Sequence, residues 1–507
     1  MLLLLAGCQQ TNHKSKETTR QIPSDEKVSV FVFDEQVISR HIHHFADSES
    51  SRIEADRQTA TYYKGDLKSL LWMDYMGVSV NADSLLQYLQ QVEELGMSRQ
   101  AFYVEEIERD LKKIRHLEID TGENDLNLVV ARLEYHLTKA CLRYVYGQRF
   151  GFIRPQRIFN GLDVEKEDDH HNVLRYRGLF NMHMDRPDGD YARRVIRKIE
   201  SDSIVDYLSE IQPQDRFYLQ LKGMLPKASS ETERQRIICN MERSRWRLQR
   251  PIPETGKRVI VNVPAFHLYA YGADTVLDMR VVCGAVATKT PLLDSQMEWM
   301  EVNPQWIIPM SIVEKDVVRH VGDTAYFARN RYQIFERATN KQLDVSEVSS
   351  EMLLSGKYRV AQQSGSGNSL GRIVFRFKNP YSVYLHYTSN PSAFRREVRA
   401  ISHGCVRVER PFELAEFLLD NPDEWLLDRI RISMDLPPMT ERGHKYLLAH
   451  QEETEHKLIG YVPVKPHVPL YIIYYTLWPD EHDVLQTWPD VYGYDKVILQ
   501  HLKPYLP

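Results

Sequence analysis

Hydrophobic residues recur at helical spacing through the first half of the chain. The strongest pattern places one apolar face at Leu126, Val129, Val130, Leu133, Leu137, Ala140, Cys141 and Tyr144. A shorter helix is predicted to open at Asp83 and Ser84 and to stop at Gly96. Its apolar face consists of Leu85, Leu89 and Val92. Polar breaks separate such segments, so the pattern predicts an all-α region over residues 28–235.

After Trp246 the hydrophobic pattern changes from helical spacing to alternation. The segments RVIVNV, HLYAY and TVLDMRVVCGA are rich in Val and Tyr and are separated by turn residues, which predicts a β-meander. IVFRF (373–377) and VYLHY (383–387) continue the alternation across the break at Asn379 and Pro380. A helix is expected from Pro411 to Leu419, with the proline in its first turn.

Mixed helical and polar sequence interrupts these strands over residues 303–371 and ends in QQSGSGNSLG. Insertions of this length inside a β domain are more often functional than idle, so we interpret it as a lid over a site. The predicted fold class is α+β and multidomain. An all-α region precedes a mainly-β domain at 236–440 that contains the insertion, and residues 441–507 form an extension expected to pack on that domain.

The amino terminus, MLLLLAGCQQ, places Leu5-Ala6-Gly7 directly before Cys8 and resembles the lipobox of a bacterial lipoprotein signal. That resemblance implies cleavage before Cys8, lipidation of its sulfur, and a signal over residues 1–8. The alternative is an ordinary Leu-rich terminus, because no Lys or Arg precedes the apolar stretch. Residues 9–27 are polar without apolar periodicity, which predicts a flexible tether.

Composition excludes several classes of protein. The 507 residues are 42% hydrophobic and 27% charged, as in ordinary multidomain globular proteins. The 65 Lys and Arg against 70 Asp and Glu give a formal charge of −5, which argues against a nucleic-acid partner. The longest internal apolar run, 468–478, is about half the roughly 20 residues that a spanning helix needs, so no transmembrane helix is predicted.

The five cysteines are Cys8, Cys141, Cys239, Cys283 and Cys405. If Cys8 carries lipid and Cys405 is catalytic, three remain and at least one is unpaired. Cys141 and Cys283 lie within apolar stretches, which favours buried, inert thiols.

The segment SHGCVRV (402–408) carries the most specific chemistry. In a strand, Val406 and Val408 would point into the core, while Cys405 and Arg407 would share the accessible face. A guanidinium beside a thiol favours the thiolate, which is the nucleophilic species. Gly404 would allow close approach of a substrate, and the amides around Cys405 are candidates for an oxyanion hole.

A thiol nucleophile needs a base, and two histidines are candidates. In VYLHY, Tyr384 and His386 fall on one face, and a neighbouring strand could bring His386 to Cys405. A lone strand histidine is more often structural, but its place beside the Cys405 motif favours the catalytic interpretation. His403 is the weaker alternative.

YLHYT followed by SHGCVRV resembles the His and Ser-x-Gly-Cys-x-Arg signature of the L,D-transpeptidase (YkuD-type) catalytic domain. Further segments resemble the large periplasmic, YcbB-like subgroup with its scaffold domain. These segments are NMERSRW (240–246), VNVPAF (261–266), Thr290-Pro291, NPQW (303–306), NSLG (368–371), YIIYYTLW (471–478) and DVYGYD (490–495). The resemblance runs from about residue 40 to the end and is stronger after residue 236.

The resemblance implies that Cys405 is the nucleophile and His386 the general base, with no cofactor and no metal. Arg407, Tyr384, Ser402 and Gly404 match residues that line or support the site, and His403 occupies the variable position. The implied partners are peptidoglycan stem peptides. A tetrapeptide donor would form a thioester on Cys405 and lose D-Ala, and the side-chain amine of a diamino acid on a second stem would accept it, giving a 3→3 cross-link.

The resemblance also implies a periplasmic place in a Gram-negative-type cell envelope, with the membrane reached only through lipid on Cys8. Cell-wall synthesis machinery is a further candidate partner, and carbapenems would target Cys405. The insertion matches the family's substrate-capping subdomain. Larger members carry a peptidoglycan-binding module that has no counterpart between Leu225 and Arg236.

Alternatives remain open at this point. With water as acceptor the same site would be an L,D-carboxypeptidase, and with a protein amine it would anchor a protein to the wall. A catalytically silent envelope scaffold is the alternative from another class. The histidines at 41, 43, 44, 170 and 171 lack a structural-zinc spacing and are expected on the solvated surface. The acidic run 165–169 is expected to be an exposed loop.

Overall fold

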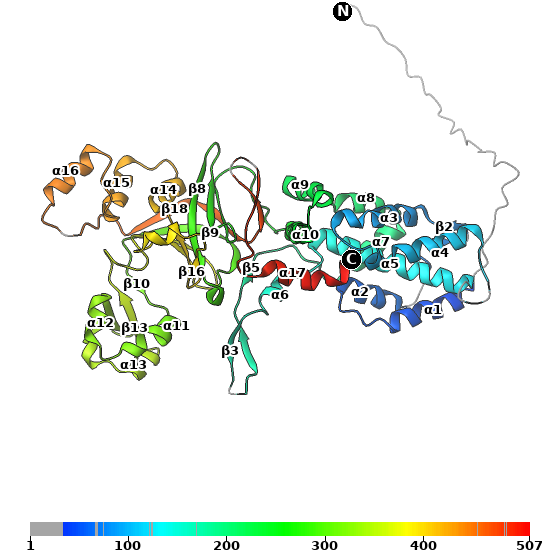
Figure 1. Ribbon diagram of the computed structural model, residues 1–507, viewed down its shortest axis with the longest axis horizontal. Coiled ribbons are helices and arrows are strands. Elements are labelled where there is room, and N and C mark those ends of the chain that lie inside the picture. The colour runs from blue at the N-terminus through cyan, green and yellow to red at the C-terminus, as the bar shows by residue number, and fades with distance from the viewer. Residues whose placement is uncertain are drawn as a thin grey trace, which may run out of the picture.

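The computed structural model describes residues 34–507, except 66–68, 75, 121, 123–124, 169, 454, 481 and 483. The expected lipobox at Cys8 and the tether at 9–27 lie outside the described residues. A helical region and a β domain follow one another along the long axis of the molecule (Figure 1).

The helical region is built around one long central helix, α5. Its helices are α1 (Glu35–Asp47), α2 (Glu54–Tyr63), α3 (Val80–Gln90), α4 (Val104–His116), α5 (Leu126–Phe150), α6 (Pro155–Phe159), α7 (Tyr191–Glu200), α8 (Ile204–Glu210), α9 (Arg216–Met224) and α10 (Glu231–Arg245). Helices α1, α2 and α4 pack against α5, which is buried on nearly all sides. The predicted helix over 126–144 is confirmed, and Asp125 caps it by accepting hydrogen bonds from the N–H groups of Asn127 and Leu128 at 3.0 and 3.2 Å.

The shorter predicted helix has different ends. It begins at Val80, so Asp83 lies in its first turn, where the carboxylate pairs with Arg115 on α4. It ends at Gln90, and Gly96 instead terminates a short 3₁₀ turn over Val92–Leu95. Gly96 has φ +79°, and a Cβ there would lie 2.5 Å from Cγ1 of Ile238, so both conformation and space require glycine.

The helical region also contains short strands that the sequence pattern did not predict. Strands β1 (Met73–Asp74) and β2 (Gly77–Val78) pair with one another, as do β3 (Val164–Glu167) and β4 (Val173–Tyr176). Residues 165–167 of the acidic run are exposed as expected, but they form part of β3 and not a loop. Strand β5 (Phe180–Asn181) joins the large sheet of the second domain by pairing in parallel with β9.

The β domain is a sheet closed on itself. Its strands are β6 (Arg258–Asn262), β7 (His267–Tyr271), β8 (Val276–Gly284), β9 (Leu292–Val302), β14 (Ile373–Phe377), β15 (Leu385–His386), β16 (Ala400–Ser402), β17 (Val406–Val408) and β18 (Tyr461–Ile473). The order is β14-β15-β17-β8-β7-β6-β18-β9, and pairing of β9 with β14 closes the ring. The predicted meander β6–β7–β8 is confirmed as an antiparallel set. The expected strand at 383–387 is reduced to β15.

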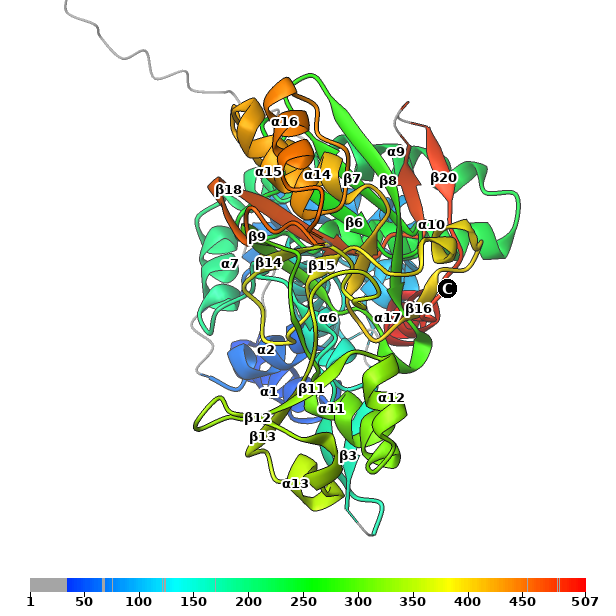
Figure 2. The same cartoon turned by 90° about the vertical axis from the view of Figure 1, so that its left-hand side faces the viewer.

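The segment between β9 and β14 folds as a unit of its own. Its elements are β10 (Trp306–Ile307), α11 (Met310–Ile312), α12 (Thr324–Arg329), β11 (Tyr332–Glu336), β12 (Gln342–Leu343), α13 (Ser350–Leu354) and β13 (Tyr358–Gln362). A separate apolar cluster that includes Val317, Phe327 and Ile334 forms its core. Both views place this inserted unit on one side of the closed sheet and the helices α14 (Pro411–Leu418), α15 (Glu424–Ser433) and α16 (Glu441–Ala449) on the other (Figures 1 and 2). The helix predicted from Pro411 is confirmed as α14.

The last part of the chain joins the two regions. Strand β18 lies within the closed sheet, parallel to β6 and antiparallel to β9, and is not an outer layer on it. Strands β19 (Leu477–Pro479) and β20 (Leu485–Thr487) follow as a hairpin, and then α17 (Tyr494–Leu502) packs against α10. The ring of Tyr505 contacts Phe102 and Phe152 of the helical region, with centroids 6.3 and 4.9 Å apart. One continuous apolar core therefore extends through both regions.

Candidate functional site

Two adjacent strands bring together the two segments that the sequence singled out. Strands β15 and β17 are parallel, with His386 opposite Arg407 in the register. The N–H of Val406 donates to the carbonyl of Tyr384 at 3.1 Å. Cys405 directly precedes β17 and so lies beside the strand that carries His386.

The alternation expected in SHGCVRV is present. Val406 and Val408 are buried, while Cys405 and Arg407 are partly exposed. Cys141, Cys239 and Cys283 are buried and unpaired. Among the described cysteines, Cys405 is thus the one that is partly exposed.

A hydrogen-bonded turn positions Cys405. The Ser402 hydroxyl donates to the carbonyl of Cys405 at 2.6 Å and accepts from the N–H of Gly404 at 3.1 Å. Thr290 donates from Oγ1 to the carbonyl of Gly404 at 2.9 Å. Gly404 has φ +118°, and a Cβ there would lie no closer than 3.7 Å to its neighbours, so backbone conformation and not space requires glycine.

The Cys405 sulfur lies in a site where burial and hydrogen bonding oppose one another. Burial raises the pKa of the Cys405 thiol to about 11, although hydrogen bonds from the backbone and hydroxyl of Tyr384 and the charges of Arg376 and Arg407 act to lower it. Arg407 therefore favours the thiolate, as expected, but does not outweigh burial. The resting group is a neutral thiol at neutral pH.

His386 is also neutral, and it is more enclosed than its place on an accessible face suggested. Its side chain is buried, and burial lowers the pKa of the imidazole to about 3, with Arg407 acting in the same direction. Backbone hydrogen bonds to Leu370 and Tyr387 act to raise this pKa but do not outweigh burial. Its Nδ1 is buried and has no hydrogen-bond partner within the described part of the chain. The exposed His403 lacks this enclosure.

The structure adds residues around Tyr384 that the sequence reasoning missed. The Arg376 guanidinium lies 4.5 Å from the centre of the Tyr384 ring and pairs with both carboxylate oxygens of Glu301, at 3.1 and 3.0 Å. The Trp306 indole lies near enough to the Tyr384 hydroxyl to lower its pKa, although Nε1 of Trp306 makes no hydrogen bond within the described residues, so the inserted unit borders the site. Trp306 lies in the NPQW segment, and Arg376 is the polar residue of IVFRF, but neither pattern specifies this neighbour.

Two structural features are absent from the described part of the chain. No group of three or more His, Cys, Asp or Glu side chains there is arranged to hold a metal ion, including the histidine clusters at 41–44 and 170–171. No helix among those residues combines the length and the hydropathy that crossing a bilayer requires.

Comparison with known proteins gives matches over both regions. Residues 256–432 match the family described as the L,D-transpeptidase catalytic domain, and residues 57–225 match the family described as the scaffold domain. A protein of Haemophilus influenzae named "Putative L,D-transpeptidase" is 28% identical over 316 residues, which make up 62% of this chain and 60% of that protein. The match therefore spans less than two thirds of that relative.

Proposed function

Since the chain combines an L,D-transpeptidase catalytic domain with a scaffold domain, we propose that it cross-links peptidoglycan stem peptides through a thioester on Cys405. The observation that carries the proposal is the partly exposed Cys405, hydrogen-bonded by Tyr384 and placed beside the strand of His386. This arrangement suits acyl transfer by a thiol and a neighbouring base.

In the first half-reaction, the Cys405 sulfur attacks the carbonyl carbon before the terminal D-Ala of a tetrapeptide stem. The thiol proton passes to the neutral imidazole of His386 as the carbon–sulfur bond forms. The tetrahedral intermediate then collapses, and D-Ala leaves as an amine that takes the proton from the imidazolium. A thioester remains on Cys405. Because both groups start neutral, charge separates only as the substrate reacts.

In the second half-reaction, the side-chain amine of a diamino acid on another stem attacks the thioester carbon. His386 accepts the proton of the attacking amine and returns it to the Cys405 sulfur as the carbon–sulfur bond breaks. The product is an amide that joins the two stems, which is a 3→3 cross-link. The free thiol is regenerated.

The neighbouring groups receive roles in this proposal. None of the hydrogen bonds within the described residues uses the N–H of Cys405, which leaves that donor available to the developing oxyanion, whereas the N–H of Gly404 is taken by Ser402. Tyr384 stabilises the sulfur when it is anionic, and Arg407 adds positive charge. Ser402 and Gly404 hold the turn. The inserted unit caps the substrate, because its Trp306 reaches Tyr384.

We further propose a cell-envelope setting, since the substrate of this chemistry is the peptidoglycan of the periplasm. Lipid on Cys8 would hold the protein to the membrane. Replacing Cys8 by Ser and following the protein between membrane and soluble fractions tests this part: retention in the membrane fraction would contradict it.

The central experiment measures the intact mass of the wild type and of Cys405→Ala after incubation with a carbapenem and, separately, with disaccharide-tetrapeptide. A drug adduct on the wild type alone, together with 3→3 dimers, is the expected result. Shortened tripeptide without dimers would assign an L,D-carboxypeptidase, and muropeptides linked to protein would assign wall anchoring. Absence of any adduct would favour a catalytically silent envelope scaffold.

A further inference from the structure

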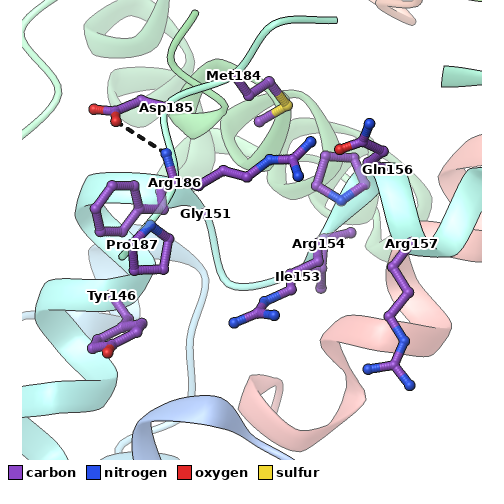
Figure 3. Close-up of a pocket in the computed structure, with 12 residues that line it drawn as sticks. Tyr146, Gly151, Ile153, Arg154, Gln156, Arg157, Met184, Asp185, Arg186 and Pro187 are labelled. Atoms are coloured by element: carbon purple, nitrogen blue, oxygen red, sulfur yellow. Dashed lines mark hydrogen bonds between the residues drawn. The ribbon is translucent and has the colours of Figure 1, made fainter. Parts of the chain in front are cut away.

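A cavity lies in the helical region, beside the place where α6 contacts β5 of the large sheet and away from the residues of the proposed catalytic site. It has a volume of about 320 Å³ and is bounded by the end of α5, by α6 and by the segment 184–187 (Figure 3). A neighbouring cavity of about 580 Å³ shares Tyr146, Ile153, Arg154 and Arg157 with it and extends to α2 and the end of α17. Neither lining includes Cys405, His386 or Tyr384.

The charge of this junction cavity, meaning the two neighbouring cavities together, is strongly positive. Its charged lining consists of Arg52, Arg57, Arg154, Arg157 and Arg186 against Glu54 and Asp185. Both carboxylates already have partners: Glu54 pairs with Arg57 and, at 3.4 Å, with Arg154, and Asp185 pairs with Arg149 outside the lining. In a chain of formal charge −5, this is a local concentration of the opposite sign.

The side chains of Arg157 and Arg186, like that of Arg52, have no protein partner among the described residues. Within the described residues, the guanidinium groups of Arg157 and Arg186 make no hydrogen bond and no ion pair, and both side chains are exposed. Figure 3 shows Arg186 extending across the cavity toward the segment that carries Gln156. Arg157 extends from α6 away from Arg186, on the side of the neighbouring cavity that it also lines. The Oε1 atom of Gln156 is buried and also lacks a partner.

The remaining wall of the cavity is apolar, with Tyr146, Phe150, Ile153, Pro155 and Met184. Guanidinium groups bind carboxylates and phosphates through paired N–H donors. An unpaired amide beside an apolar wall fits a ligand with a peptide backbone and short aliphatic side chains better than it fits a bare phosphate. The chemistry therefore favours a short peptide that carries several carboxylates.

We propose that the junction cavity is an accessory site for the stem peptide of a peptidoglycan strand, held by its carboxylates on Arg157 and Arg186. The choice of ligand rests on the proposed function, because a stem peptide is the anionic peptide that such an enzyme meets. Helix α9 ends at Met224 and α10 begins at Glu231, so the described residues hold no separate domain between these two helices. The cavity in the helical region supplies a contact with the wall.

The test uses the full chain with Cys405→Ala, so that the ligand is not consumed. Binding of disaccharide-tetrapeptide is measured by calorimetry with and without Arg157→Gln, Arg186→Gln or both. Two binding events are expected, one at the Cys405 site and one at the cavity, and each substitution should weaken only the second, about tenfold, since a charge-assisted hydrogen bond is lost. Arg197→Gln on α7 removes the same charge from an exposed side chain outside the cavity and should leave affinity unchanged.

Hydrogen exchange locates the bound ligand. Exchange in the peptides that cover 151–160 and 184–187 should slow when disaccharide-tetrapeptide binds, and this protection should disappear in the double variant. Equal affinity and equal protection in the double variant and in Arg197→Gln would overturn the proposal. Binding of phosphatidylglycerol vesicles that depends on Arg157 and Arg186, without binding of the muropeptide, would also overturn it, in favour of a lipid headgroup.

A separate measurement keeps this proposal distinct from the proposed function. Proteins that retain Cys405, with and without Arg157→Gln and Arg186→Gln, are treated with a carbapenem and weighed. Equal acylation together with weaker muropeptide binding supports the accessory site. If the wild type is not acylated, the proposed function fails, whereas the binding and exchange results still decide whether the cavity holds the peptide.

Discussion

The hydroxyl of Tyr384 should control the reactivity of Cys405, and Tyr384→Phe removes it while keeping the ring. The hydroxyl donates a hydrogen bond to the sulfur, and this bond lowers the pKa of the Cys405 thiol against the larger effect of burial. The ring remains beneath the Arg376 guanidinium in the variant, 4.5 Å from its centre in the wild type. The substitution therefore tests the hydrogen bond and not the packing.

The magnitude follows from the charge of the acceptor. A hydrogen bond to a charged group contributes about 1.5–3 kcal/mol, so its loss should raise the pKa of Cys405 by roughly 1–2 units. The thiolate population below that pKa then falls by about 10-fold to 100-fold. A more basic thiolate is also a better nucleophile, with a Brønsted coefficient of about 0.4–0.5, so alkylation should slow by only about 3-fold to 16-fold.

The assay follows alkylation of Cys405 by iodoacetamide across pH 6–10, with the modified peptide quantified by mass spectrometry. The buried Cys141, Cys239 and Cys283 should react far more slowly than the partly exposed Cys405. In the wild type the rate should keep rising with pH toward the pKa of about 11, without a plateau near neutrality. Tyr381→Phe, in the same loop, is the matched control. Identical rate profiles for Tyr384→Phe and Tyr381→Phe would refute the reasoning.

Three further substitutions test the remaining structure. When the pH falls from 7 to 4.5, the unfolding free energy measured in urea should decrease less in His386→Gln than in the wild type, by roughly 2–3 kcal/mol. The reason is that burial lowers the pKa of His386 to about 3, so that between this value and about 6.5 only the unfolded chain takes up the proton. An equal decrease in unfolding free energy in the wild type and the variant would contradict this reasoning. Arg245→Ala should cost about 3–5 kcal/mol of unfolding free energy, because removing the buried guanidinium leaves the buried Glu242 carboxylate without its ion-pair partner. It also removes donors to Gln148 and Tyr218, both at 3.0 Å, and Arg234→Ala on the same helix should cost far less. Gly404→Ala should cost about 1–3 kcal/mol of unfolding free energy because the φ of Gly404 is +118°. An unfolding temperature no lower than that of Gly189→Ala would exclude such strain.

Features that depend on neighbours in sequence were predictable. The helical spacing over 126–144 became α5, and the alternation in SHGCVRV placed Val406 and Val408 inward and Cys405 outward. The meander β6–β8 and the helix from Pro411 followed from period and from turn residues. Side-chain periodicity is a property of the local backbone, so a pattern of apolar residues carries it directly.

Features that depend on which distant segments meet were not predictable. No local pattern shows that β18 enters the ring between β6 and β9, or that Glu301 pairs with Arg376 beside Tyr384. The same holds for His386, whose strand position suggested access. Neighbouring elements enclose it, and this burial lowers its pKa.

The sequence by itself determined the helical and β regions and the inserted segment, and it singled out a thiol and a histidine whose segments prove to be neighbours in the sheet. The tertiary structure decided their electrostatics, because desolvation depends on every element that covers a group and not on the strand that carries it. It also decided that Arg157 and Arg186 border one cavity, since helix α6 and the segment 184–187 lie far apart in sequence and are brought together only by tertiary packing.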